Sequence, residues 1–251
     1  MALAGPRSAL FPARPPVRLL TPWKLPIAFT AGNFSESADA VATRLSTAGF
    51  RSIAIQMGGA SADVAQVFRD HGLAVYVWNV PQVDDAPAVK RELADLGAVG
   101  WIPQVEKLGQ YEALRTDLVA GVGENLPRAV VTNFEDITAP RMRPLIAAGI
   151  TTAFVECYLQ DKDPQHSHGD LIWMIYYARV YGWKRAVPVI GLYGDEYHLR
   201  DYDTAAYFAW SHTRALGAWG IYLIEGVSRD DWDGLGRVSK GNLIDDRAGG
   251  T

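Results

Sequence analysis

The chain has 251 residues, of which 49% are hydrophobic and 21% are charged, and its formal net charge is -4. This length can bury one large core or two small ones. The charges form no basic block, so we expect no nucleic-acid partner. No run approaches the roughly 18 apolar residues of a membrane span, and the first residues lack the continuous apolar segment of a signal peptide. We therefore expect no membrane partner.

Residues 1–23 are rich in proline and arginine. Proline fixes φ and removes a hydrogen-bond donor, which forbids a helix and favours an extended arm. Two interpretations stay open: a disordered terminus, or an arm that docks on a neighbouring subunit. We expect residues 24–238 to form the folded domain. Residues 239–251, rich in glycine, aspartate and arginine, are expected to form a flexible tail.

Short apolar runs alternate with longer segments of helical character from residue 24 onward. The runs predict eight strands, at residues 25–31, 52–56, 73–78, 98–104, 129–131, 151–158, 186–193 and 218–225. The intervening segments predict helices at 35–49, 60–71, 86–96, 108–120, 138–149, 171–181 and 202–216, with a turn or short helix at 229–235. Ser35 or Ser37 is expected to cap the first helix, and Thr138 the fifth.

A glycine stands between a predicted helix and the next predicted strand six times, first at Gly49 and last at Gly217. This is the position of a helix C-cap in a βα unit. The near-continuous apolar strands are typical of a parallel sheet covered by helices. The pattern predicts an α/β fold, a single (β/α)8 TIM barrel with an extended proline-rich N-terminal arm. A doubly wound open sheet is the alternative, but no Gly-x-Gly-x-x-Gly pattern follows the first strand.

Glutamates close several of the predicted strands. The carboxyl ends of barrel strands meet at one rim, and neighbouring strands lie about 4.8 Å apart. Two such carboxyl groups can therefore reach the roughly 5–9 Å separations used in glycoside cleavage. The candidate catalytic residues are Glu106, Glu135, Glu156 and Glu225. Structural alternatives are ion pairs of Glu135 with Arg141 or Arg143, and of Glu106 with Lys107.

Amides and aromatic residues share the predicted rim with these glutamates. Amides and acids bind sugar hydroxyls, and aromatic faces stack on sugar rings. The predicted substrate-binding residues are Asn33, Gln56, Trp78, Asn79, Gln104, Asn133, Tyr158, Tyr193 and Asp195. Asp195 stands beside Glu196 in a polar loop, where simple solvation of both charges is the alternative.

The sequence predicts neither a metal site nor a cofactor. His166 and His168 belong to a polar loop with nearby aspartates, but catalytic metal sites usually draw ligands from rigid elements. No serine-hydrolase elbow, phosphate-binding loop or His-Glu-x-x-His pattern is present. The single cysteine, Cys157, lies on an apolar strand and is expected to be a buried hydrophobe.

Over residues 23–232, strands alternate with helices, and glutamates stand at the ends of the fourth, fifth, sixth and eighth predicted strands. This pattern resembles the glycoside-hydrolase-like TIM barrels. In style it is similar to the compact barrel domains of actinobacterial phage tail proteins. The resemblance implies a polysaccharide or cell-wall glycan as partner and a location in the virion or the cytoplasm. The chain departs from chitinase-like barrels, which carry Asp-x-Asp-x-Glu on the fourth strand, and from lysozyme-like ones, which start with Asp-x-Ser.

Two functions from different classes follow. The first is a glycosidase in which Glu156 or Glu135 is the acid, and Glu106 or Glu225 the nucleophile or base. The second is a non-catalytic barrel of a larger assembly such as a phage tail, a minor tail protein anchored by its arm on neighbouring subunits of the virion. A small-molecule barrel enzyme such as an aldolase is less well supported, because no lysine stands at a strand end.

Overall fold

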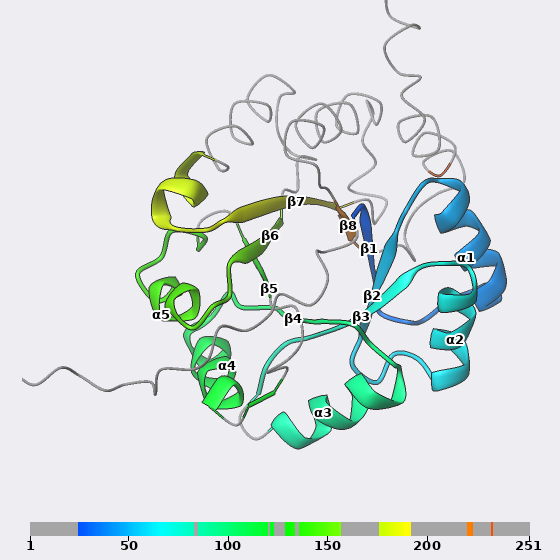
Figure 1. Cartoon of the computed structure of the whole chain (residues 1–251), viewed down its shortest axis with the longest axis horizontal. Helices are drawn as coiled ribbons and strands as arrows, with labels where there is room; N and C mark the ends of the chain where they lie inside the picture. The colour runs from blue at the N-terminus through cyan, green and yellow to red at the C-terminus, as the bar shows by residue number, and fades with distance from the viewer. Residues whose placement is uncertain are drawn as a thin grey trace, which may run out of the picture.

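Figure 1 shows a computed structural model of the chain, which describes residues 25–82, 85–119, 121–122, 129–133, 136–156, 176–191, 220–222 and 232. The predicted arm at 1–23, the tail at 239–251 and the predicted helix at 202–216 lie outside these residues. Within them, parallel strands alternate with helices, so the α/β prediction is confirmed. No helix among the described residues is long and apolar enough to cross a membrane.

Eight strands pair side by side in parallel, in the order β4-β3-β2-β1-β8-β7-β6-β5. Their bounds are β1 (Ile27–Thr30), β2 (Ser52–Gln56), β3 (Ala74–Asn79), β4 (Trp101–Pro103), β5 (Ala129–Asn133), β6 (Thr152–Glu156), β7 (Arg185–Gly191) and β8 (Gly220–Tyr222). The two strands at the ends of this order also meet. Gln104 forms a bridge with Val131, and Val105 N–H donates to the Val131 carbonyl at 2.7 Å. The strands therefore follow one another around a ring.

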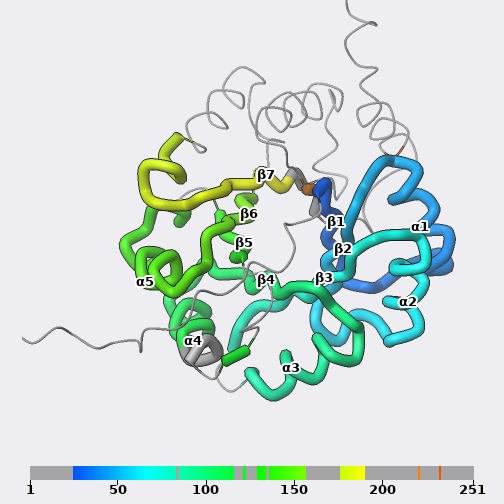
Figure 2. Tube along the Cα trace, viewed as in Figure 1, coloured from blue at the N-terminus to red at the C-terminus, as the bar shows by residue number. Residues whose placement is uncertain are grey.

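The helices of the described residues lie outside this ring, as Figures 1 and 2 show. They are α1 (Ala38–Thr47), α2 (Ala62–Asp70), α3 (Ala86–Asp95), α4 (Leu108–Val119) and α5 (Met142–Ala147), and residues 176–181 are also helical. Ser37 caps α1 by accepting from Ala40 N–H, as predicted. The prediction that Thr138 caps the fifth helix is wrong, because α5 begins at Met142, after turns at 136–141.

The strands are buried on both faces, which explains their near-continuous apolar sequences. Inside the ring, the Phe29 ring packs edge-on against Trp78 and Phe154, at centroid distances of 6.5 and 5.7 Å. A second, larger cluster fills the space between the strands and the helices. Successive side chains of a strand alternate between these two layers. A residue two positions after an inward-facing one therefore faces inward as well.

The segments that follow β1 and β2 approach each other through two glycines. Gly32 has φ +89°, and a Cβ placed on it would overlap the carbonyl oxygen of Gly59. A Cβ on Gly59 would in turn overlap the carbonyl oxygen of Ala31. Glycine is needed at both positions because backbone, rather than a flexible side chain, occupies the space.

We predict that Gly32→Ala destabilises the fold by at least about 2 kcal/mol more than Gly72→Ala, because it adds backbone overlap to the strain of a positive φ. Gly72 is a matched control, since its φ is +78° and nothing lies within 4 Å of the position that an alanine Cβ would take. Urea unfolding of both variants measures the difference. Equal losses of stability would contradict the close approach of the two segments.

Candidate functional site

Parallel strands bring their carboxyl ends to one rim of the ring. Register places Gln56 beside Trp78 and Asn133 beside Glu156 at this rim. The structure describes eight of the predicted site residues: Asn33, Gln56, Trp78, Asn79, Gln104, Glu106, Asn133 and Glu156. The other five lie outside the described residues: Glu135, Tyr158, Tyr193, Asp195 and Glu225.

Gln104 brings two of the predicted catalytic glutamates together. Its amide nitrogen Nε2 donates to Glu106 Oε1 at 2.7 Å and to Glu156 Oε1 at 3.2 Å. Gln104 follows inward-facing Ile102 by two positions, and Glu156 follows inward-facing Phe154 in the same way. The side chains of Gln104, Glu106 and Glu156 are all partly exposed. Two carboxylates, one just after β4 and one at the end of β6, thus converge on one amide at the rim.

The separation of these two carboxylates is limited by the shared amide. Oxygens bonded to one nitrogen at 2.7 and 3.2 Å can lie no farther apart than about 6 Å. An amide NH2 group has two hydrogens and can satisfy both acceptors at once. The arrangement offers two carboxyl groups, a short distance apart, to a molecule that enters from the rim.

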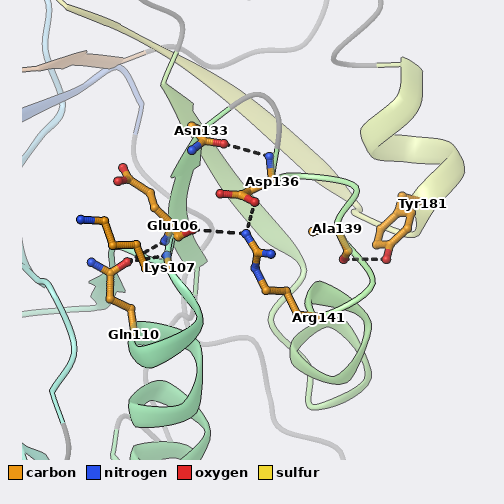
Figure 3. Close-up of polar contacts among 8 residues, drawn as sticks. All are labelled: Glu106, Lys107, Gln110, Asn133, Asp136, Ala139, Arg141 and Tyr181. Atoms are coloured by element: carbon orange, nitrogen blue, oxygen red, sulfur yellow. Dashed lines mark hydrogen bonds and ion pairs between the residues drawn. The ribbon is translucent and has the colours of Figure 1, made fainter.

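The backbone of Glu106 is held on both sides by other side chains (Figure 3). Gln110 Oε1 accepts from the N–H groups of Glu106 and Lys107 at 2.8 and 2.9 Å, in the manner of a side chain that reaches back from the first turn of a helix. Arg141 Nη2 donates to the carbonyl oxygen of Glu106 at 3.2 Å. The carboxylate of Glu106 points away from Arg141 in this view.

Arg141 also forms an ion pair with Asp136, whose side chain is 16% exposed. The backbone N–H of Asp136 donates to Asn133 Oδ1 at 2.8 Å, so the strand β5 and the following turn are tied together. The residue pattern suggests Arg141 or Arg143 as a partner of Glu135, and it predicts neither the role of Asp136 nor that of Gln110. The asparagine at the end of the strand is an available signal for such a side-chain turn, because its Oδ1 can accept from a backbone N–H a few residues later.

Other predicted binding residues have different surroundings. Asn79 is 3% exposed and follows Val77 of the outer layer, and its Oδ1 accepts from Trp101 Nε1 at 2.9 Å. Trp78 is also 3% exposed and donates through Nε1 to the Thr30 carbonyl at 2.9 Å. Asn33 is exposed, and Gln56 is partly exposed. Gln104 and Asn133 are therefore the predicted binding residues that the structure places with the glutamates.

Metal ligands do not gather in the part of the chain that the structure describes, where no group of three or more His, Cys, Asp or Glu side chains could hold an ion. The loop with His166 and His168 lies outside the described residues, and so does Cys157. The amide and carboxylate groups of the rim are the candidate chemistry of the described site.

No protein-family model and no curated protein sequence matches this chain. Its fold is similar to solved structures. The catalytic domain of a hyperthermophilic chitinase from Pyrococcus furiosus superposes with a TM-score of 0.62 at 10% identity, over 86% of this chain and 94% of that one. Active domain 2 of a thermostable chitinase from the same organism also gives 0.62 at 10% identity, over 90% and 96% of the two chains.

An archaeal fructose-1,6-bisphosphate aldolase superposes with a TM-score of 0.54 at 13% identity, over 86% of this chain and 93% of that one. These neighbours carry out different reactions on a shared architecture, so the likeness shows the fold and leaves the activity to the site. The chain therefore shares a TIM-barrel-like fold with these structures.

We predict that Asn79→Ala lowers the free energy of unfolding by about 1–2 kcal/mol, because it leaves the Trp101 indole N–H without its acceptor inside the protein. Asn33→Ala is the matched control, and its exposed side chain should change stability by less than about 0.5 kcal/mol. Thermal and urea unfolding compare the two variants. A neutral Asn79→Ala variant would contradict a structural role for this amide.

Proposed function

We propose that this protein is a glycoside hydrolase that cleaves a polysaccharide or cell-wall glycan, with Glu106 and Glu156 as its paired carboxyl groups. The observation that carries the proposal is the amide of Gln104, which bonds to both carboxylates at the strand-end rim. Paired carboxyl groups at this spacing are the catalytic unit of most glycosidases. The two chitinase domains of similar fold support this choice of reaction class.

The separation of the carboxylates favours one stereochemical course. The two bonded Oε1 atoms lie within about 6 Å of each other, which suits the roughly 5–5.5 Å between the carboxyl groups of retaining enzymes better than the roughly 6.5–9.5 Å of inverting ones. In the retaining course, one carboxylate attacks the anomeric carbon while the other carboxyl group protonates the departing glycosidic oxygen. The second group then takes a proton from water, which hydrolyses the glycosyl ester and restores both residues.

The remaining rim residues complete the proposal. Asn133 and Gln56 are proposed to bind sugar hydroxyls, together with residues outside the described ranges, namely Tyr158, Tyr193 and Asp195. Glu135 and Glu225 stay candidates for further acidic roles at the same rim. A full (β/α)8 barrel over residues 24–238, in which a helix follows every strand, is the architecture that we propose for the site.

The alternative is a non-catalytic barrel that binds a glycan or serves a larger assembly such as a phage tail. The proline-rich sequence of residues 1–23 favours it, because an extended arm of this kind can anchor a domain to a neighbouring subunit. The contacts of Arg141 argue the other way. A non-catalytic barrel predicts that arginines form ion pairs with the carboxylates of the rim glutamates. The guanidinium of Arg141 instead pairs with the carboxylate of Asp136 and contacts Glu106 only at its backbone carbonyl.

We predict that the purified protein hydrolyses at least one of peptidoglycan, arabinogalactan or chito-oligosaccharides. Glu106→Gln and Glu156→Gln should each lower kcat roughly 10²–10⁴-fold, because each removes a proton-transfer or nucleophilic group. Glu112→Gln, which removes an exposed glutamate paired with Arg115 on α4, is the matched control and should retain activity. Reducing-sugar release measures turnover, and circular dichroism checks folding.

The same assay separates the alternatives. Full activity of both Gln variants would exclude these two glutamates as the catalytic pair. Absence of turnover by the wild-type protein, combined with retention of a glycan on a pull-down column, would support the non-catalytic binding barrel. With an active protein, proton NMR of the first-formed anomer reports the stereochemical course, and inversion would contradict the proposed double displacement.

A further inference from the structure

The seam between β4 and β5 has the fewest paired positions of the ring among the described strands. β5 and β6 pair over five positions and β2 and β3 over five, whereas β4 and β5 meet through the single bridge between Gln104 and Val131 and the bond from Val105 N–H. Glu106 stands immediately beyond this seam. Its backbone has left the sheet, so ladder hydrogen bonds do not define its position.

Glu156 is placed differently. It is the last residue of β6, and it pairs with Asn133 of β5 on one side and with Val189 of β7 on the other. The backbone of Glu156 is therefore fixed by strands on both sides. The spacing of the two carboxylates depends mainly on what holds Glu106.

Arg141 and Gln110 both hold the Glu106 backbone. The guanidinium of Arg141 joins the Glu106 carbonyl to the carboxylate of Asp136. A planar guanidinium can bond two partners in a fixed geometry, which an ammonium group cannot reproduce. Arg141 contacts the backbone carbonyl of Glu106, and the carboxylate of Glu106 accepts from Gln104 instead.

The turn that carries Asp136 and Arg141 is itself held in place. The buried Trp183 donates through Nε1 to the Ile137 carbonyl at 2.8 Å, and Tyr181 donates through its hydroxyl to the Ala139 carbonyl at 2.7 Å. Both aromatic residues come from the end of the helical segment 176–181 and the turn after it, and their side chains reach back to the turn before α5. The guanidinium is therefore presented to Glu106 from a segment with its own tertiary hydrogen bonds.

We infer that Arg141, held by Asp136, is a positioning residue for Glu106: it fixes the backbone of Glu106 beyond the β4–β5 seam and so sets the spacing between Glu106 and Glu156. This inference rests on the proposed function only where it predicts a change in the rate of glycan hydrolysis. The positional effect itself is a property of the folded protein, and the side-chain amide of Gln104 reports it because that amide bonds to both glutamates.

The test compares Arg141→Met and Arg141→Lys with wild type by ¹H–¹⁵N NMR of the Gln104 side-chain NH2 group, whose signals are identified by their loss in Gln104→Met. We expect the signals to shift in Arg141→Met and their exchange with solvent to accelerate about tenfold or more, since displacement of Glu106 removes an acceptor. Arg141→Lys should give an intermediate result. Arg44→Met is the matched control, because Arg44 of α1 pairs with Glu36 and lies over the Trp232 ring, away from the turn before α5, and it should leave the signals unchanged.

On a hydrolysed glycan, Arg141→Met should lower kcat roughly tenfold to a hundredfold with KM within about twofold, since misplacement of a reacting group by about 1 Å has effects of this size.

Wild-type Gln104 signals in a folded Arg141→Met or Arg141→Lys variant would overturn the positioning role, whether or not the protein is active. An inactive wild-type protein with displaced Gln104 signals in Arg141→Met would remove the proposed function and keep the positioning role. If Arg141→Met does not fold, the comparison of Arg141→Lys with Arg44→Met decides.

Discussion

The contact between β4 and β5 is the constraint on which the rest of the site depends. Without the bridge from Gln104 to Val131, the eight strands would form an open sheet with β4 and β5 at its two edges. Closure brings Gln104 and Glu156 to the same side of one rim, although 52 positions separate them in the sequence. The two carboxylates meet because a closed ring of strands has no edges. A closed ring surrounded by helices also buries both faces of each strand.

Much of the fold could be predicted because its signals are local. Predicted and observed bounds agree for β2, and glycines such as Gly49, Gly72 and Gly97 have the positive φ values expected after a helix. The start of α5 could not be predicted, because the carbonyls of the preceding turn accept hydrogen bonds from Tyr181 and Trp183. These partners lie more than 40 residues away in the sequence, and capping rules consider only neighbouring residues.

The candidate site could be predicted in part for a similar reason. Strand ends identify Gln104, Glu106 and Glu156 as rim residues, since a parallel ring exposes its carboxyl ends together. The sequence does not show which of two adjacent polar or aromatic residues faces inward, so it predicts both Trp78 and Asn79 as binding residues, although they face opposite layers. The ion pair of Arg141 with Asp136 depends on the path of a turn, which residue types alone do not determine.

The unequal support of the two glutamates has a consequence for the evolution of this rim. A carboxylate such as Glu156, on a backbone fixed by neighbours on both sides, tolerates little change in its surroundings. Glu106 belongs to the short connection between β4 and α4. Inserting one residue in this connection would move the Glu106 carboxylate without disturbing the ring of strands. Changes in the spacing of the two carboxylates are therefore expected to arise from length changes in the segment between β4 and α4.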